Sequence, residues 1–245
     1  MRAWAIHHNY DKARKAHPDL PEDGATVPMI FGSAFHKVVE DKAKNAKEIR
    51  KALDDVLGKS DPAYDSTYSG RDDVAKGLRV ALNAFLADPQ SAPWKDGSAR
   101  LVEKKLSAEI DGIPVRGIMD CIDGDGMVID IKTTTPRAEC DYGSQLTTYW
   151  LMARENMEGI QDRAKVLKVF RPWGPKGKSG VLAERLSAKA NEKHVRRLLQ
   201  KVWALRETKK TWQKDYNEIE SNPSAKRCRY CPAQGTSACP ETRRW

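Results

Sequence analysis

Residues 117–135 read GIMDCIDGDGMVIDIKTTT and carry a clear strand signal. Two apolar runs flank the turn sequence GDG, and the second is rich in β-branched residues, so the stretch predicts two strands joined by a tight hairpin. Residues two apart on a strand project from the same face, about 6.6 Å apart. Asp130 and Lys132 therefore share one face, whereas Ile129 and Ile131 point into the core from the other.

The hairpin also brings the strand of Asp120 back against that of Asp130. Two carboxylates then converge beside the ammonium group of Lys132. Carboxylates at close range repel each other unless a proton or a cation lies between them, and Mg²⁺ prefers oxygen ligands. The alternative is an Asp–Lys salt bridge on a solvated strand face, which a D-x-K tripeptide alone favours because the pattern is common by chance.

The rest of the sequence predicts helices on both sides of a meander of strands. We expect helices over 3–14, 31–57 with one possible break, 71–88, 145–157 and 187–214. Strands are expected over 100–110, 115–123, 127–135, 164–173 and 181–187. Residues 88–98 are expected to form a loop. This order predicts an α/β fold with a central mixed sheet flanked by helices.

Composition is compatible with one substantial folded domain. Of the 245 residues, 40% are hydrophobic and 31% are charged, which permits a packed core. No run of about 18 apolar residues occurs, so we expect no membrane-spanning helix. The opening residues MRAWAIHHNYDKARK lack a signal-peptide pattern, and a cytoplasmic protein is the default expectation.

Positive charge is concentrated in the last third of the chain. Residues 161–245 contain 21 Lys+Arg and 8 Asp+Glu, against 22 and 26 in residues 1–160. The asymmetry indicates an anionic partner, with nucleic acid first, although a solvated basic helix face is an equally good interpretation. Trp173, Trp203 and Trp212 lie among these cations, where they could stack on bases, but we expect tryptophans to pack in the core.

Two further groups of residues, one of three and one of two, have helical spacing. Gly32, His36 and Glu40 in GSAFHKVVE are four apart and share a helix face, and so do Gln145 and Tyr149 in QLTTY. Each motif alone is weak, because a single histidine is more often a core or surface residue than a ligand.

Taken in order, GSAFHKVVE, GIMD, VIDIKT and QLTTYWLM resemble the RecB-type nuclease domain of the PD-(D/E)XK superfamily. The resemblance covers residues 30–155 and extends to the C-terminal cysteines. It implies a restriction-endonuclease-like fold and hydrolysis of DNA phosphodiesters with one or two Mg²⁺ or Mn²⁺ ions.

The resemblance also assigns roles to single residues. It implies that Asp120 and Asp130 are metal ligands, that His36 is a further ligand or organises the metal site, and that Lys132 is the catalytic lysine. Within the same resemblance, Gln145 and Tyr149 support the active site and the DNA backbone. Glu103 is expected on the neighbouring strand, near the site.

Three of the five cysteines crowd into the C-terminal segment. The five are Cys121, Cys140, Cys228, Cys231 and Cys239. The spacing C-x2-C occurs in zinc and iron–sulfur sites alike. The resemblance to iron–sulfur CRISPR-associated and AddB-type exonucleases implies a four-iron, four-sulfur cluster on Cys228, Cys231 and Cys239.

In those relatives the fourth cluster cysteine lies near the N-terminus, and here no cysteine precedes Cys121. One hypothesis is a reading frame that begins further upstream and supplies it, which an upstream sequence without an in-frame cysteine would disprove. The alternatives are Cys140 as the fourth ligand or a degenerate site. Cys121 lies between strand residues and is expected in the core.

We therefore expect a metal-dependent exonuclease that acts on single strands or DNA ends without sequence specificity. We expect it to act in DNA recombination or repair, and its size is typical of phage or mobile-element enzymes. The expected parts are 1–100 with the histidine motif, 101–185 with the nuclease core and 186–245 with the basic helix and cysteines. The alternatives are a non-catalytic DNA-binding module that retains the fold, and a zinc-ribbon interaction protein.

Overall fold

A five-stranded sheet organises the part of the chain that the computed structural model describes, residues 27–57, 67–135 and 142–207. The strands are β1 Leu101–Ile110, β2 Ile113–Ile122, β3 Val128–Thr134, β4 Arg163–Phe170 and β5 Val181–Ser187. The helices are α3 Val27–Glu40, α4 Ala46–Leu57, α5 Arg71–Ala87, η1 Pro89–Ser91 (a 3₁₀ turn), α6 Ala92–Asp96, α7 Gly143–Asn156 and α8 Ala188–Glu207.

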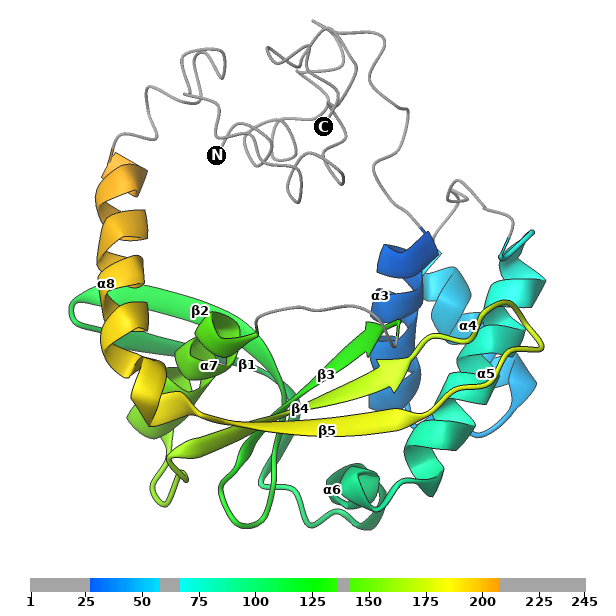
Figure 1. Cartoon of the computed structure of the whole chain (residues 1–245), viewed down its shortest axis with the longest axis horizontal. Helices are drawn as coiled ribbons and strands as arrows, with labels where there is room; N and C mark the ends of the chain where they lie inside the picture. Colours follow the sequence, from blue (N-terminus) through cyan, green and yellow to red (C-terminus); the bar gives the residue numbers. More distant parts are fainter. Residues whose placement is uncertain (1–26, 58–66, 136–141, 208–245) are drawn as a thin grey trace, which may run out of the picture. The chain divides into compact units, whose positions relative to one another are not determined.

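The sheet is mixed, as the sequence predicted, and its order is β1-β2-β3-β4-β5. Strands β1, β2 and β3 form an antiparallel meander, β4 lies parallel to β3, and β5 is antiparallel to β4. Asp111 and Gly112 turn the first hairpin with φ of 51° and 78°, the left-handed conformation that a two-residue hairpin turn requires. Helix α7 makes the crossover that a parallel pair needs (Figure 1).

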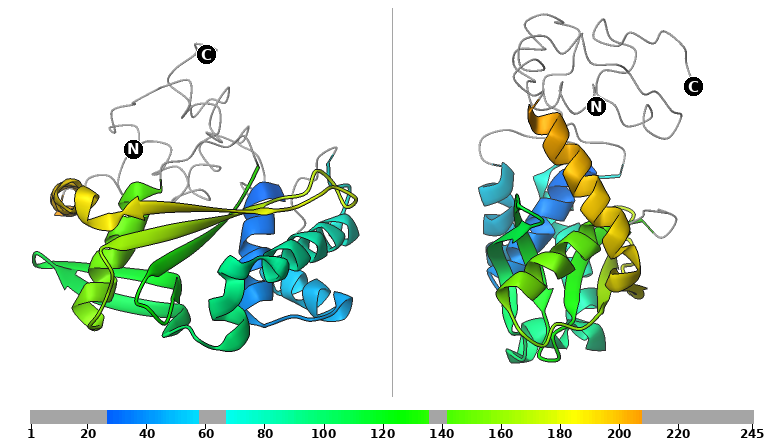
Figure 2. Two further views of the ribbon diagram at one scale, coloured as in Figure 1. Left: turned by 60° about the horizontal axis from the view of Figure 1, so that its bottom comes forward. Right: turned by 90° about the vertical axis from the view of Figure 1, so that its left-hand side faces the viewer.

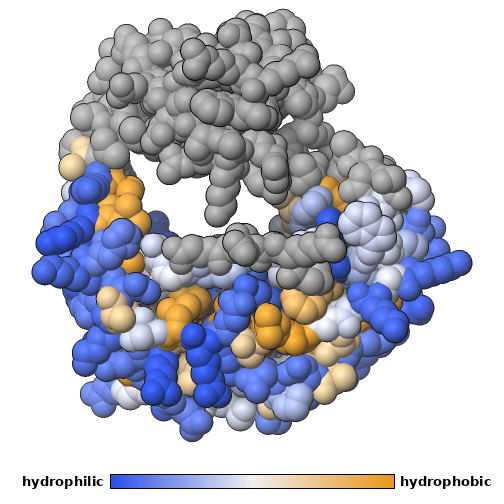
Figure 3. Space-filling view, viewed as in Figure 1, coloured by the Kyte–Doolittle hydropathy of each residue, from blue (hydrophilic) through white to orange (hydrophobic). Residues whose placement is uncertain are grey.

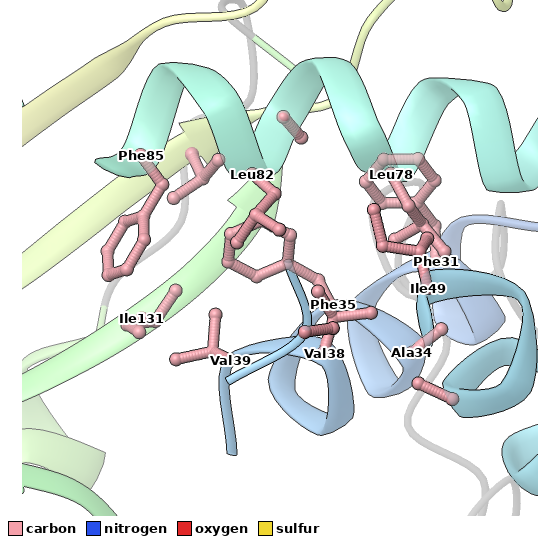
Figure 4. Close-up of a cluster of buried hydrophobic side chains, with 14 of the residues drawn as sticks. Phe31, Ala34, Phe35, Val38, Val39, Ile49, Leu78, Leu82, Phe85 and Ile131 are labelled. Atoms are coloured by element: carbon pink, nitrogen blue, oxygen red, sulfur yellow. The ribbon is translucent and has the colours of Figure 1, made fainter. Parts of the chain in front are cut away.

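Two apolar clusters lie on opposite faces of this sheet. One joins α3, α4 and α5 to β3 and β4, and Figure 4 shows Ile131 of β3 facing Phe35 and Phe85 of the helices. The other joins α7 and the start of α8 to the opposite face, around the buried Trp150. Figure 2 shows the sheet between these groups of helices. The predicted α/β fold with flanking helices is thus confirmed.

The helix predicted over residues 31–57 is broken once. Lys42 adopts a φ of 51° after the end of α3, and Asn45 starts α4, since its Oδ1 accepts hydrogen bonds from the backbone N–H groups of Lys47 and Glu48, both at 3.0 Å. Asparagine is among the best helix N-caps because its side chain satisfies such free donors. The break falls where a good cap interrupts the apolar spacing.

The prediction of a plain loop over residues 88–98 was wrong. Asp88 accepts a hydrogen bond of 2.8 Å from the backbone N–H of Gln90 and caps η1, which continues into α6. Trp94 of α6 is buried against Phe85, with ring centroids 5.4 Å apart. Burial of one large aromatic side chain outweighs the low helix propensity of this proline-containing segment.

Several sequence predictions lie outside the described residues. They concern the helix over 3–14, the possible ligand Cys140 and the cluster cysteines Cys228, Cys231 and Cys239. The division into parts at residues 100 and 185 also stays a prediction. Cys121 is fully buried in the core, as expected. Within the described ranges, no helix is long and apolar enough to cross a membrane.

Candidate active site

The candidate site begins where β2 and β3 separate. Their ladder ends at the pair of Cys121 and Ile129. One residue further on, Asp120 Oδ2 accepts a hydrogen bond of 2.6 Å from the backbone N–H of Ile131. This bond replaces a strand-to-strand hydrogen bond, so it keeps the backbone satisfied and fixes a buried carboxylate in the opening between the strands.

Glu103 enters the site through an unusual backbone conformation. The neighbouring pairs of the β1–β2 ladder place it opposite Asp120, and its φ is 45°, a value that strains a residue other than glycine. Leu101 and Leu106 are five residues apart yet pack in the same cluster, which strict alternation would forbid. The alternation of side chains between the two faces of β1 therefore changes at Glu103, and the Glu103 side chain turns toward α3.

His36 approaches these carboxylates from α3. Its Nδ1 donates a hydrogen bond of 3.3 Å to Glu103 Oε1 and lies 3.5 Å from Asp120 Oδ1. Gly32, one helical turn earlier, makes this approach possible, because a Cβ there would lie 3.0 Å from Thr133 Oγ1 of β3. Figure 1 shows the end of β3 beside α3.

Asp130 and Lys132 project from the same face of β3, as predicted. Lys132 Nζ donates a hydrogen bond of 3.0 Å to Asp130 Oδ1 and lies 2.9 Å from Oδ2, without hydrogen-bond geometry to Oδ2. The Asp130 side chain is 1% exposed and that of Lys132 is 25% exposed. Among the described residues Asp130 Oδ2 has no hydrogen-bond partner, so a buried carboxylate oxygen retains acceptor capacity.

The electrostatics indicate too little positive charge around the carboxylates. Burial and the charge of Asp120 raise the pKa of Asp130 to about 6, although Lys132 opposes the shift. Burial also raises the pKa of Asp120, against the opposing effect of His36. Burial lowers the pKa of His36, but the hydrogen bond to Glu103 and the nearby carboxylates outweigh it and raise that pKa. A bound cation would relieve this crowding.

Helix α7 brings Gln145 and Tyr149 to the same region. Gln145 Nε2 donates a hydrogen bond of 3.1 Å to the Tyr149 hydroxyl. Burial, together with the charges of Asp130 and Asp120, raises the pKa of Tyr149. Gly117 of β2 leaves room for the ring, because a Cβ there would lie 3.0 Å from Tyr149 Cε1. The first residue of GIMD thus determines how closely α7 approaches the sheet.

The predicted site residues do not all fall into one group. His36, Glu103 and Asp120 offer ligand atoms within 4.8 Å of one another, whereas Asp130 pairs with Lys132 beside them. Glu40 lies 3.5 Å from Lys37 and is exposed, so it does not join the cluster. The metal role of Asp130 and the catalytic role of Lys132 stay predictions.

Sequence reasoning missed two residues next to Lys132. Lys168 of β4 lies opposite Lys132 in the parallel ladder, and both ammonium groups lie near the ring of Tyr142. Neither residue belongs to a recognisable motif, and the register of a parallel pair joined by a crossover helix is not readable from spacing.

The residues expected to contact DNA are only partly as predicted. The expectation that tryptophans pack in the core was wrong for Trp173, which is 79% exposed. Trp203 is partly buried, and Trp212 lies outside the described ranges.

Figure 3 shows hydrophilic residues over the outer side of α8. Lys189, Lys193, Arg196 and Arg197 of this helix line a hollow of about 420 Å³, although Arg196 is paired with Asp111 at 2.5 Å.

The donor set fits Mg²⁺ or Mn²⁺. Carboxylate oxygens are the ligands that both ions prefer, and one imidazole is compatible with Mn²⁺. The unpartnered Oδ2 of Asp130 and the raised carboxyl pKa values of Asp120 and Asp130 are what a site built around a cation would show without one.

A mixed sheet with a carboxylate–lysine cluster where its central strands separate is the architecture of the restriction-endonuclease-like nucleases. The chain belongs to the PD-(D/E)XK nuclease superfamily, whose family model matches residues 5–240. Nucleases of this superfamily use divalent metals and act on DNA.

Solved structures are similar in fold. A crystal structure of a candidate exonuclease from Eubacterium rectale is 10% identical, covers 84% of this chain and 79% of its own, and has a TM-score of 0.55. The structure of the protein SSO0001 is 15% identical over 98% of this chain and 96% of its own, with a TM-score of 0.41. No curated protein matches the chain.

Proposed function

We propose that this protein is a metal-dependent DNA nuclease that acts as an exonuclease on single strands or DNA ends. The observation that carries the proposal is the cluster of His36, Glu103 and Asp120 beside the buried pair of Asp130 and Lys132. Three carboxylates with one ammonium group in a partly buried site are costly for folding and useful for holding a cation against a phosphate.

His36, Asp120 and Asp130 would hold Mg²⁺ or Mn²⁺, with Glu103 as a further donor. A bound divalent ion supplies Lewis-acid stabilisation of negative charge on the phosphate. The protein's own part is to keep these oxygens in place, and the hydrogen bond from Ile131 to Asp120 and the strained backbone of Glu103 do so.

Lys132 supplies a fixed positive charge beside that position. Asp130 holds its ammonium group at 3.0 Å, and the side chain reaches solvent. A lysine so placed donates charge-assisted hydrogen bonds to a phosphate oxygen or to the attacking water. The pair of Gln145 and Tyr149 closes the site from α7 and would orient the substrate backbone.

Digestion of labelled DNA tests the proposal. Single-stranded, double-stranded and circular DNA would be incubated with Mg²⁺, Mn²⁺ or a chelator. We expect metal-dependent release of nucleotides from linear DNA, resistance of circular DNA, and loss of release in Asp130→Ala. Cleavage of circles would replace the exonuclease assignment with an endonuclease, and no cleavage of any DNA with any of these ions would refute the nuclease.

The second candidate is a non-catalytic DNA-binding module. Domains that have lost catalysis need not retain a buried carboxylate pair with a raised pKa, because it destabilises the fold. Binding of DNA without metal-dependent cleavage would favour this alternative.

On the family resemblance alone, we further propose an iron–sulfur cluster on Cys228, Cys231 and Cys239 and a role in DNA recombination or repair in a phage or mobile element. Iron and sulfide analysis of anaerobically purified protein tests the cluster. Iron with visible absorption, lost in Cys231→Ser, is expected. Zinc without iron would indicate a zinc ribbon instead.

Trp173 is expected to stack on a DNA base. It lies in the loop after β4, which leaves the sheet beside the end of β3, since the Arg171 backbone N–H donates to the Thr134 carbonyl at 2.7 Å. Trp173→Ala should weaken binding of single-stranded DNA about tenfold, because stacking contributes roughly 1–3 kcal/mol per base. Ile118→Ala, a change at another exposed apolar residue, is the control in the same anisotropy titration. Equal affinities would refute stacking.

A further inference from the structure

Two lysines lie side by side on the sheet, and the proposed chemistry uses only one. Lys132 of β3 and Lys168 of β4 are partners in the parallel ladder. Residues in register on parallel strands project to the same face, and strands lie about 4.8 Å apart. Lys168 is 8% exposed, so most of its side chain is buried beside the site.

Both ammonium groups converge on one aromatic ring. Lys132 Nζ and Lys168 Nζ lie 5.9 Å and 5.7 Å from the centroid of Tyr142, within the range of a cation–π contact. Tyr142 is the N-cap of α7, a helix of 14 residues. Two ammonium groups therefore lie near the side chain of the residue that begins a helix, and the positive end of a helix dipole favours an anion.

The ammonium group of Lys168 lies next to a carboxylate that is partly exposed to solvent. Its Nζ is 2.6 Å from Glu184 Oε1, and the Glu184 side chain is 44% exposed. Lysine commonly buries its stem while the ammonium group reaches toward water. A phosphate can therefore approach Lys168 from the same side as Lys132.

We propose that Lys168, Tyr142 and the start of α7 form a second phosphate subsite, which binds the backbone phosphate next to the one that is cleaved. The ligand class is a nucleic-acid phosphodiester. This inference rests on the proposed nuclease function. It adds to the site a residue that binds the DNA strand beside the cleaved bond. Lys168 contributes to substrate binding and Lys132 to the chemical step.

An ion pair with Glu184 alone would also explain a buried Lys168, and the two explanations differ in what they predict. A purely structural ion pair affects stability and leaves DNA affinity unchanged. A phosphate contact changes DNA affinity and its salt dependence, because each neutralised phosphate releases counterions.

Lys165 provides a matched control. It lies on the same strand, is 6% exposed, and donates to Gln90 Oε1 at 2.9 Å on the opposite face, where its neighbour Leu167 packs with the N-terminal helices. Lys168→Gln and Lys165→Gln would be compared in an Asp120→Asn background with Mg²⁺, which prevents cleavage. Binding of a single-stranded oligonucleotide would be followed by fluorescence anisotropy at several salt concentrations.

Lys168→Gln should bind about five- to tenfold more weakly, and its plot of log affinity against log salt should be shallower by about 0.7. Lys165→Gln should match the parent in both respects. Lys168→Met, which retains the apolar stem, should repeat the result if Lys168→Gln does not fold. Unchanged affinity and slope in the folded Lys168 variant would refute the subsite.

Oligonucleotides in which one phosphate is replaced by an uncharged linkage would identify the phosphate that Lys168 contacts. In a series of oligonucleotides with one methylphosphonate each, one position should weaken binding by the parent but not by Lys168→Gln. Equal sensitivity of both proteins at every position would also refute the subsite. Cleavage by the otherwise wild-type protein is assayed separately, so that failure of the subsite and failure of the nuclease function are distinguishable.

Discussion

Lys132→Met is expected to lower the rate of DNA hydrolysis by about 10³-fold while the protein remains folded. Methionine retains most of the length and the apolar character of the side chain but not the charge. Loss of one preorganised donor at a reacting centre costs about 10²–10³ in rate, and loss of assistance in proton transfer costs 10²–10⁴. Single-turnover cleavage with saturating Mg²⁺ measures the chemical step directly.

Lys165→Met is the matched control for this prediction. It removes a lysine, more deeply buried than Lys132, from the opposite face of the neighbouring strand, and we expect wild-type rates. Thermal unfolding of both variants checks that the fold is intact. If Lys132→Met retained a tenth or more of the wild-type rate, the assignment of Lys132 to the chemical step would be wrong.

Asp130→Asn is expected to stabilise the metal-free protein at pH 7.5 by on the order of 3 kcal/mol. Burial and the charge of Asp120 raise the pKa of Asp130 to about 6 in the folded state, from an ordinary value of 3.8. A difference of about two pH units corresponds to roughly 3 kcal/mol of unfolding free energy. Asparagine resembles the neutral carboxyl that the fold prefers, so the variant avoids this cost.

The raised pKa of Asp130 also determines how the stability of the protein depends on pH. A raised folded-state pKa means that the folded protein binds the proton more tightly, so the stability contributed by Asp130 is fully present below about pH 4. It is lost as pH rises through 6. The difference in unfolding free energy between Asp130→Asn and wild type should therefore grow from pH 4 to pH 7 in chelator.

Denaturant unfolding at several pH values measures this difference, with the exposed Asp55→Asn as a control that follows wild type. Mg²⁺ should stabilise wild type and have little effect on Asp130→Asn, because the carboxylate that attracts the ion is gone. A pH-independent difference between the two proteins would show that folding does not raise the pKa of Asp130. Such a trade of stability for function is common at catalytic sites.

The sequence by itself determined the elements and much of the site. Alternating apolar residues and the turns DG and GDG specify the meander, because side-chain period and turn chemistry are local properties. For the same reason, the shared face of Asp130 and Lys132 followed from strand geometry. The helical spacing of Gln145 and Tyr149 likewise placed their side chains within a hydrogen bond of each other.

Only the tertiary structure decided how these pieces meet. The separation of β2 from β3 at Asp120 and the strained backbone at Glu103 depend on contacts between segments far apart in the chain. The opposition of Lys132 and Lys168 arises because a crossover helix sets the register of the parallel pair. Local propensity carries no information about such pairings, since their free energy comes from burial and charge interactions between distant segments. The sequence therefore specified the motifs, and tertiary packing decided their geometry.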